Sequence, residues 1–198
     1  MFKNNFWIDH LEYNNDEFIS TILNYLKVHG SSSIWDYCKV ESSHQLDYKP
    51  QVPQDLVDLL NLRIKQFEKT ELGSIFSDLK ISDIWYNIYT QDMNQEVHTH
   101  EDTGFSGIYF LKFDNNLHTS PVFHNPVFYY NFHHQALRSI EKINYTPKIK
   151  QGDLIIFPGN IPHQVEKQKS NIPRITITFN IDINLQDLYT NFLKTVVG

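Results

Sequence analysis

Three side chains that can ligate a metal ion stand at alternate positions in one short segment: His98, His100 and Asp102. In an extended chain, residues i and i+2 project to the same side, so all three can face one way. Any adjacent pair of them can then supply two ligands to one ion. A solvated hairpin turn can carry the same residues, so this segment alone does not establish a metal site.

A third histidine stands after a buried-type strand farther along the chain. Residues 152–163 run through a Gly-Asp turn, the apolar stretch 154–157, a Pro-Gly turn and then His163. Pro162 fixes the direction of the chain just before this histidine. We therefore expect His163 to stand at the mouth of a barrel, where it can act as a third ligand.

An arginine opens the strand at residues 174–181. Because side chains alternate along a strand, Arg174 and Thr176 share one face, opposite Ile175 and Ile177. A guanidinium that points into an otherwise apolar barrel needs an anionic partner, since an unpaired buried charge is expensive. Arginine binds carboxylates through two parallel hydrogen bonds, and a neighbouring hydroxyl adds another. The pair predicts a socket for a dicarboxylate.

The helices and strands that must position these residues can be read from the spacing of apolar residues. This spacing changes from helical to extended near residue 80. Apolar residues at helical spacing predict a helix from Asn15 to Gly30 and a second from Pro53 to Gly73. Further along, short segments rich in aromatic and β-branched residues predict strands at 84–89, 106–111, 127–130, 154–157 and 174–181. We expect a mainly β protein with N-terminal helices, in which the strands form an antiparallel sandwich or barrel. The single domain divides into a helical support (1–80), a β core (81–184) and a C-terminal helix or tail (185–198).

The order of these motifs resembles that of the Fe(II)/2-oxoglutarate-dependent oxygenases. Within them it is similar to a prolyl-hydroxylase-like subgroup found in marine bacteria and their phages. The resemblance covers roughly residues 84–182, and its motifs are residues 85–88, 98–100, 106–111, the strand to Pro158, His163 and 174–180. It implies a double-stranded β-helix (jelly-roll, cupin-like) core, one ferrous iron, 2-oxoglutarate and O2, with ascorbate as a reductant. The implied activity is a dioxygenase, in particular a hydroxylase, that couples oxidative decarboxylation of 2-oxoglutarate to C–H oxidation. Arg174 and Thr176 would then bind the distal carboxylate of 2-oxoglutarate.

Two sets of three residues are candidates for the metal ligands. The usual facial triad has two histidines and one carboxylate, which favours His100, Asp102 and His163, because an anionic ligand stabilises high-valent iron. The subgroup pattern carries a His-x-His pair at this turn, which favours His98, His100 and His163. We prefer the three-histidine set and keep Asp102 as the alternative.

A cupin-type protein of another class is the main rival. Metal-dependent isomerases and non-catalytic jelly-roll binding modules share the barrel and the His-x-His turn. They do not require the pair Arg174 and Thr176. Neither reading identifies the substrate, which we expect to be a small molecule or a peptide. The aromatic segment 121–134 is either a lid or an ordinary insertion between strands.

Composition narrows the partners and the compartment. The chain has 198 residues, and its 17 Lys and Arg against 23 Asp and Glu give a net charge of −6, which argues against a general nucleic-acid binder. Cys38 is the single cysteine, so no internal disulfide framework is expected. The apolar runs are far shorter than the roughly 20 residues that a membrane span needs. We expect a protein of the cytoplasm, in a bacterium or a phage-infected cell, and a homodimer is compatible with the sequence.

Overall fold

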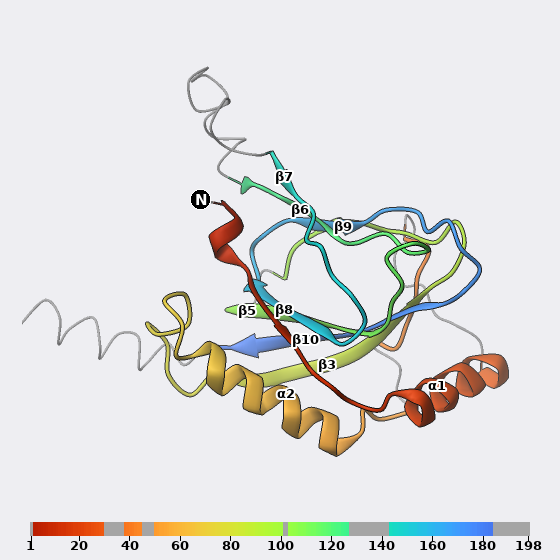
Figure 1. Cartoon of the computed structure of the whole chain (residues 1–198), viewed down its shortest axis with the longest axis horizontal. Helices are drawn as coiled ribbons and strands as arrows, with labels where there is room; N and C mark the ends of the chain where they lie inside the picture. The colour runs from red at the N-terminus through yellow and green to blue at the C-terminus, as the bar shows by residue number, and fades with distance from the viewer. Residues whose placement is uncertain (1, 30–37, 45–49, 101–102, 127–142, 184–198) are drawn as a thin grey trace, which may run out of the picture.

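Two antiparallel sheets form the body of the protein in this computed structural model, which describes residues 2–29, 38–44, 50–100, 103–126 and 143–183 (Figure 1). The six-stranded sheet has the order β1 (Trp7–His10), β8 (Asp153–Pro158), β5 (Phe105–Lys112), β10 (Arg174–Asp182), β3 (Lys80–Tyr89), β2 (Glu41–Ser42). The four-stranded sheet has the order β4 (Gln95–His98), β9 (His163–Val165), β6 (Val122–His124), β7 (Asn144–Tyr145). The expected mainly β, jelly-roll architecture is confirmed.

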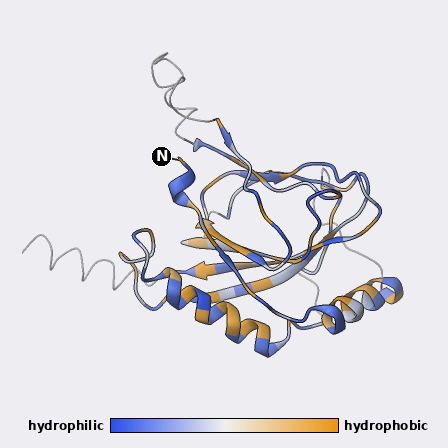
Figure 2. Cartoon of the chain, in the orientation of Figure 1, coloured by the Kyte–Doolittle hydropathy of each residue, from blue (hydrophilic) through white to orange (hydrophobic). Residues whose placement is uncertain are grey.

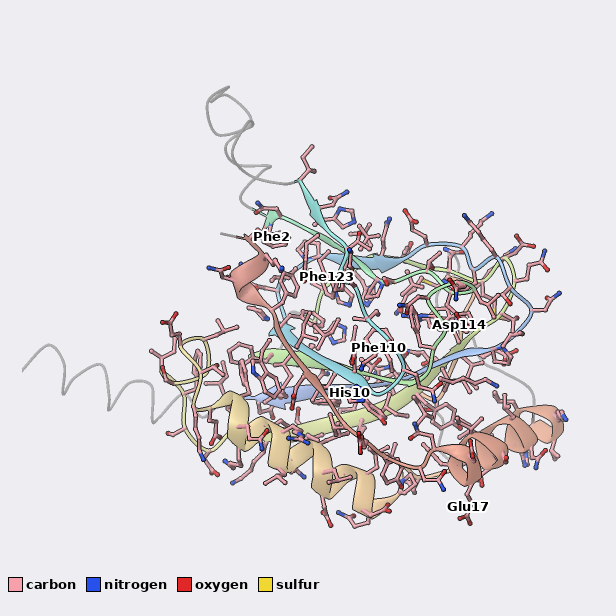
Figure 3. The ribbon with its side chains drawn as sticks, in the orientation of Figure 1. Phe2, His10, Glu17, Phe110, Asp114 and Phe123 are labelled. Carbon is pink, nitrogen blue, oxygen red and sulfur yellow. The ribbon has the colours of Figure 1, made fainter. Side chains whose placement is uncertain are left out.

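The larger sheet separates two apolar layers. On one side, Ile175 and Ile177 of β10 pack with residues of α1 (Asp16–His29) and α2 (Gln54–Phe67). On the other side, Phe110 of β5 packs in one cluster with Phe123 of the smaller sheet. Figure 3 labels these two phenylalanines between the sheets, and Figure 2 colours much of β5 and β8 as hydrophobic. We call the face of the larger sheet that is turned toward the smaller sheet its inner face, and the face covered by the helices its outer face.

Both predicted helices are present and cover the outer face of the larger sheet (Figure 1). The four apolar residues that we placed on one face of the second helix are all fully buried: Leu56, Leu60, Ile64 and Phe67. This helix ends at Phe67, six residues before Gly73. A Cβ atom at Gly73 would lie 2.1 Å from the carbonyl oxygen of Phe67, so the chain turns there only with glycine.

The first 80 residues supply more than helices. The N-terminal strand β1 pairs with β8, and β2 pairs with β3, so both extend the larger sheet. The Nδ1 atom of His10 lies 2.8 Å from a carboxylate oxygen of Asp153, its partner in the strand register. A short 3-10 helix (Phe2–Asn5) precedes β1. We did not predict these strands, and they bind the helical region to the barrel by backbone hydrogen bonds.

Four of the predicted strands appear as β3, β5, β8 and β10, each extended by one to four residues at one or both ends. The predicted strand at 127–130 and the C-terminal segment 185–198 lie outside the described residues, as does most of the segment 121–134. In the part of the chain that is described, the helices are too short or too polar to cross a bilayer.

We predict that the apolar face of α2 holds the helix on the sheet. Replacing the fully buried Leu60 by alanine should lower the free energy of unfolding by about 2–5 kcal/mol, because it removes apolar contacts and leaves a cavity. Leu62, in the same helix but 54% exposed, is the matched control, and its replacement should change stability by less than about 0.5 kcal/mol. Urea denaturation measures both. Equal effects would contradict this packing.

We also predict that residues 1–80 do not form a separate domain. A protein shortened to residues 80–198 loses both helices and β1, so the outer face of the larger sheet and the edge of β8 become exposed. It should be insoluble, or it should bind a hydrophobic dye and melt without cooperativity. A monomer that melts cooperatively would make the one-domain prediction wrong.

Candidate metal and cosubstrate site

Three histidines from two neighbouring strands of the smaller sheet converge. His98 is the last residue of β4 and His163 is the first residue of β9, and the two are direct partners in the strand register. His100 follows two residues after His98. One ring nitrogen from each of the three lies within 4.8 Å of the other two. This spacing suits three ligands on one face of a metal ion.

Hydrogen bonds fix which nitrogen of each ring carries the proton. The Nδ1 atom of His98 lies 2.8 Å from the carbonyl oxygen of Glu96, and that of His163 lies 3.0 Å from the carbonyl oxygen of Ile161. The Nδ1 atom of His100 lies 2.7 Å from the side-chain oxygen of Asn180. These oxygens accept hydrogen bonds, so each Nδ1 donates and the lone pair is on Nε2. Each ring is thus in the tautomer that binds a metal through Nε2.

Burial keeps the three rings neutral. Desolvation lowers the pKa of His98 to about 4, and it also lowers the pKa of His100. His163 is only 3% exposed, and burial, together with the two neighbouring histidines, holds its pKa well below the usual value. Neutral imidazole is the form that ligates a metal, so the cluster needs no deprotonation near neutral pH.

The structure brings together one of the two ligand sets that the sequence left open. His98, His100 and His163 form the cluster, while residues 101–102, including Asp102, lie outside the described residues. The three-histidine set therefore remains our prediction for the metal site.

Arg174 reaches the same cavity from the larger sheet. Its side chain is 1% exposed, and its guanidinium carbon lies 4.7 Å from the centre of the Tyr89 ring. Among the residues that the structure describes, its Nε and Nη1 atoms have no hydrogen-bond partner. Thr176, also buried, lies beside it on the inner face of β10, as we predicted. Arg174, Thr176 and the three histidines all line one narrow cavity between the sheets.

We did not predict several residues around this cavity. Tyr89 donates a hydrogen bond of 2.6 Å to the side-chain oxygen of Gln95, and burial raises the pKa of Tyr89 to about 12. The ring of Trp85 stacks on that of His100, with centres 5.8 Å apart and planes inclined by 19°. The alternation of residues in β3 contained this signal, because Trp85, Asn87 and Tyr89 occupy every second position and all line the cavity.

A second, wider cavity adjoins the cluster on another side. It shares Trp85, Gln95, His98 and His100 with the narrow one. Its other lining residues come from several loops and strands: Cys38, His44, Glu96, Thr99, Thr103 and Asn180. His98 and His100 therefore stand between two spaces, an inner one that contains Arg174 and an outer one that does not.

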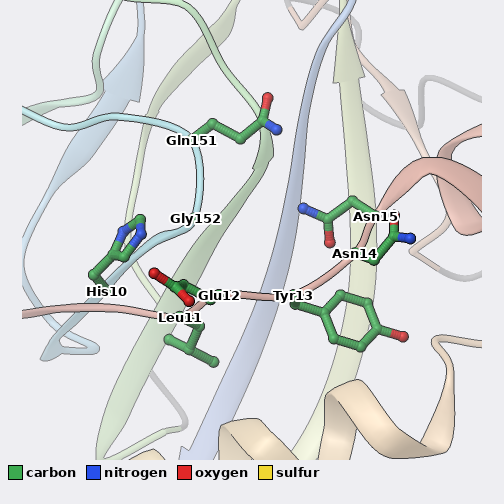
Figure 4. A pocket seen from close by; sticks show the side chains of 8 residues that line it. All are labelled: His10, Leu11, Glu12, Tyr13, Asn14, Asn15, Gln151 and Gly152. Carbon is green, nitrogen blue, oxygen red and sulfur yellow. The ribbon is translucent and has the colours of Figure 1, made fainter.

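Another groove lies apart from both cavities. It is formed by residues 11–15 of the chain between β1 and α1, together with His10, Gln151 and Gly152 (Figure 4). Gly152 has a φ angle of +85°, and a Cβ atom there would lie 2.7 Å from the ring of His10. None of the residues that line this groove lines the histidine cavities.

Comparison with known families identifies this arrangement. The model of a family described as "Putative 2OG-Fe(II) oxygenase" matches residues 83–180, about half of the chain, including the three histidines and Arg174. The chain belongs to the 2-oxoglutarate-Fe(II) oxygenases. As a member of this family it is an enzyme, a dioxygenase that uses Fe(II), 2-oxoglutarate and O2. The cupin-type alternative lacks such support.

Solved oxygenase structures share the whole fold. A Pseudomonas putida prolyl-4-hydroxylase is 12% identical, with a TM-score of 0.62 over 91% of this chain and 93% of that chain. A viral collagen prolyl hydroxylase from Paramecium Bursaria Chlorella virus-1 is 11% identical, with a TM-score of 0.57 over 89% of this chain and 94% of that chain. A Trichoplax adhaerens prolyl hydroxylase is 13% identical, with a TM-score of 0.62 over 94% of this chain and 87% of that chain. No curated protein sequence matches the chain. The oxygenase thus has the prolyl-hydroxylase-like fold.

Proposed function

We propose that this oxygenase holds Fe(II) through His98, His100 and His163 and binds the distal carboxylate of 2-oxoglutarate through Arg174 and Thr176. The substrate, a small molecule or a peptide, enters by the outer cavity and is hydroxylated at a C–H bond. The observation that carries this proposal is the buried guanidinium of Arg174, whose Nε and Nη1 atoms have no hydrogen-bond partner among the described residues and which lines the same cavity as the histidines.

The guanidinium fits an anionic ligand better than any other. Burial lowers the pKa of Arg174, yet arginine stays protonated in proteins, so its positive charge persists. Tyr89 compensates for part of the lost hydration through its ring and through a side-chain hydrogen bond to the guanidinium, but Nε and Nη1 have no acceptor among the described residues. A carboxylate satisfies two such donors at once, and the hydroxyl of Thr176 can donate to the same group.

The chain's own residues bind and orient the cofactors and the substrate. The cofactors supply the oxidising chemistry. Bound iron, with 2-oxoglutarate and O2, supplies an oxidant while 2-oxoglutarate is converted to succinate and CO2. Arg174 would fix one end of 2-oxoglutarate, and the three neutral histidines would hold the iron. The smaller sheet covers the inner cavity with residues of β4 and β9, among them His98, His163 and Val165. No side chain needs to act as a general base.

The outer cavity suits the substrate because it reaches His98 and His100 without passing Arg174. Its described lining includes aromatic and hydrogen-bonding groups, among them Trp85, Glu96 and Asn180, and no Lys or Arg. A substrate bound there would lie beside His98 and His100 and away from Arg174. We expect the enzyme in the cytoplasm, where Fe(II) and cysteine thiols stay reduced.

The metal site is tested with alanine variants at single ligands. His163→Ala should weaken Co(II) binding by more than about 100-fold, because loss of a ligand should exceed the 10- to 100-fold cost of losing its hydrogen-bond partner. Asp102→Ala, measured in the same series, should bind Co(II) nearly as well as the unmodified protein. Calorimetric titration measures both affinities.

Two outcomes would change this assignment. Full Co(II) affinity in His163→Ala would show that the proposed site is wrong. A loss in Asp102→Ala equal to that in His163→Ala would move the assignment to His100, Asp102 and His163.

The role of Arg174 is tested by 2-oxoglutarate binding under anaerobic Fe(II), followed by the metal-to-ligand charge-transfer absorption. Arg174→Ala should cost about 2–5 kcal/mol, because it removes a charge-assisted pair and leaves a carboxylate buried without a partner. This corresponds to a loss of roughly 30- to 4,000-fold in affinity. Arg174→Lys should recover part of it, since the charge remains while the fork geometry does not.

Metal affinity in Arg174→Ala should remain near that of the unmodified protein, because Arg174 is not a ligand. Arg63→Ala is the control for loss of a cation, since Arg63 lies on α2 and contacts Asp9 instead of the cavity. If the unmodified protein binds no 2-oxoglutarate at millimolar concentration, or if Arg174→Ala binds it equally well, the proposed cosubstrate site is wrong.

A further inference from the structure

Asn180 contacts a proposed metal ligand from the opposite sheet. It lies on the same face of β10 as Arg174 and Thr176, at the end of the strand where the pairing with β3 shifts register. Its side-chain oxygen lies 2.7 Å from Nδ1 of His100 and also accepts a hydrogen bond of 3.3 Å from the hydroxyl of Ser106, its cross-strand neighbour on β5. Two donors therefore converge on one oxygen atom.

The three histidines differ in what holds them. His98 and His163 each bond to the backbone carbonyl two residues before them, at Glu96 and Ile161. Such an acceptor belongs to the backbone and needs no particular side chain. His100 depends on a side chain 80 residues away in the sequence. Of the three Nδ1 acceptors, Asn180 is therefore the one that a substitution can remove.

Two contacts together fix the ring of His100. The Trp85 ring, nearly parallel to it, restricts its plane. Stacking alone still permits a half-turn of the ring about its Cβ–Cγ bond, which keeps the ring plane but exchanges the positions of Nδ1 and Cδ2, and it does not select the tautomer. The hydrogen bond to Asn180 removes this freedom, because the amide oxygen accepts only from a protonated Nδ1.

We propose that Asn180 is the positioning residue of the metal site: its amide oxygen holds His100 with Nε2 directed at the metal. This inference rests on the proposed three-histidine site and adds a residue to it that does not touch the metal. Asn180 also lines the outer cavity, so it stands between the substrate side and the ligand.

The neutral amide has an electrostatic consequence. The three histidines are neutral, and their acceptors are two backbone carbonyls and one amide. These ligands and acceptors bring no negative charge to the metal, so the carboxylate of 2-oxoglutarate that is not paired with Arg174 would supply the balancing charge. Metal and 2-oxoglutarate should therefore strengthen each other's binding, by the same factor in both directions. A carboxylate at position 180 would supply part of that charge beforehand.

The test compares Asn180→Ala and Asn180→Asp by titration with Co(II) under argon, with and without 2-oxoglutarate. Asn180→Ala should weaken Co(II) binding by about 10- to 100-fold, as expected for loss of the partner of a ligating histidine. Asn180→Asp keeps an acceptor of the same shape, so it should bind Co(II) at least as tightly as the unmodified protein. The factor by which 2-oxoglutarate increases Co(II) affinity should fall at least threefold in Asn180→Asp.

Asn15→Ala is the matched control. Asn15 is a buried asparagine in the separate groove of Figure 4, and its amide donates to the carbonyl oxygen of Leu111. Its replacement should lower the melting temperature and leave Co(II) affinity unchanged. A general loss of stability would affect both asparagine variants, whereas a positioning role affects Co(II) binding in one of them only.

The outcomes separate this inference from the proposed function. If His163→Ala loses Co(II) but Asn180→Ala binds it like the unmodified protein, the metal site stands and the role of Asn180 is overturned. If Asn180→Asp binds Co(II) as weakly as Asn180→Ala, the amide does not act as an acceptor and the proposal fails. If Asn180→Ala does not fold, the affinity and coupling factor of Asn180→Asp decide alone. If the unmodified protein binds no Co(II), the site and the inference fall together.

Discussion

The alternation of side chains along β10 is the constraint on which the site depends. Every second residue of this strand packs against the helices, and the residues between them face the smaller sheet. Ile175 and Ile177 bury apolar area on one side, and this fixes Arg174 and Thr176 on the other. A shift of one residue would move the isoleucines into the polar cavity and the arginine under the helices, at a cost in both places. The apolar face of the strand thus determines where the cosubstrate's carboxylate can bind.

Burial has opposite consequences for the two kinds of polar group in the cavity. It keeps the histidines neutral, which makes them ready ligands, because the neutral form of a buried imidazole is favoured. It cannot neutralise Arg174, whose charge persists and must find an anion. One buried cavity therefore offers a metal site without negative charge at one end and a fixed cation at the other. Both properties suit a dianionic ligand that bridges the two ends.

The parts that could be predicted from the sequence are those with a long periodic pattern. The apolar face of α2 and the alternation of β10 extend over nine or more residues, so few other arrangements fit them. The strands β1, β4 and β9 have three or four residues each, too few for a period to show. They were missed because their stability comes from backbone pairing with distant partners, which leaves no local pattern. Asn180, in contrast, follows the same alternation as Arg174 and could have been predicted to face the site.

The histidine cluster depends on a short pairing between β4 and β9. His98 and His163 are opposite each other in this register, and the pairing is irregular between Gln95 and His98. Such an irregularity inserts or removes a residue and so changes which side chain points inward. On the other side of β9, His163 is paired with Phe123 of β6, whose ring is fully buried between the sheets. This apolar anchor resists a slip of β9, because a slip by one residue would bring the neighbouring polar Gln164 to the inner face. The core of the barrel therefore holds the register that makes two distant histidines neighbours, and the metal need only complete a geometry that packing has already fixed.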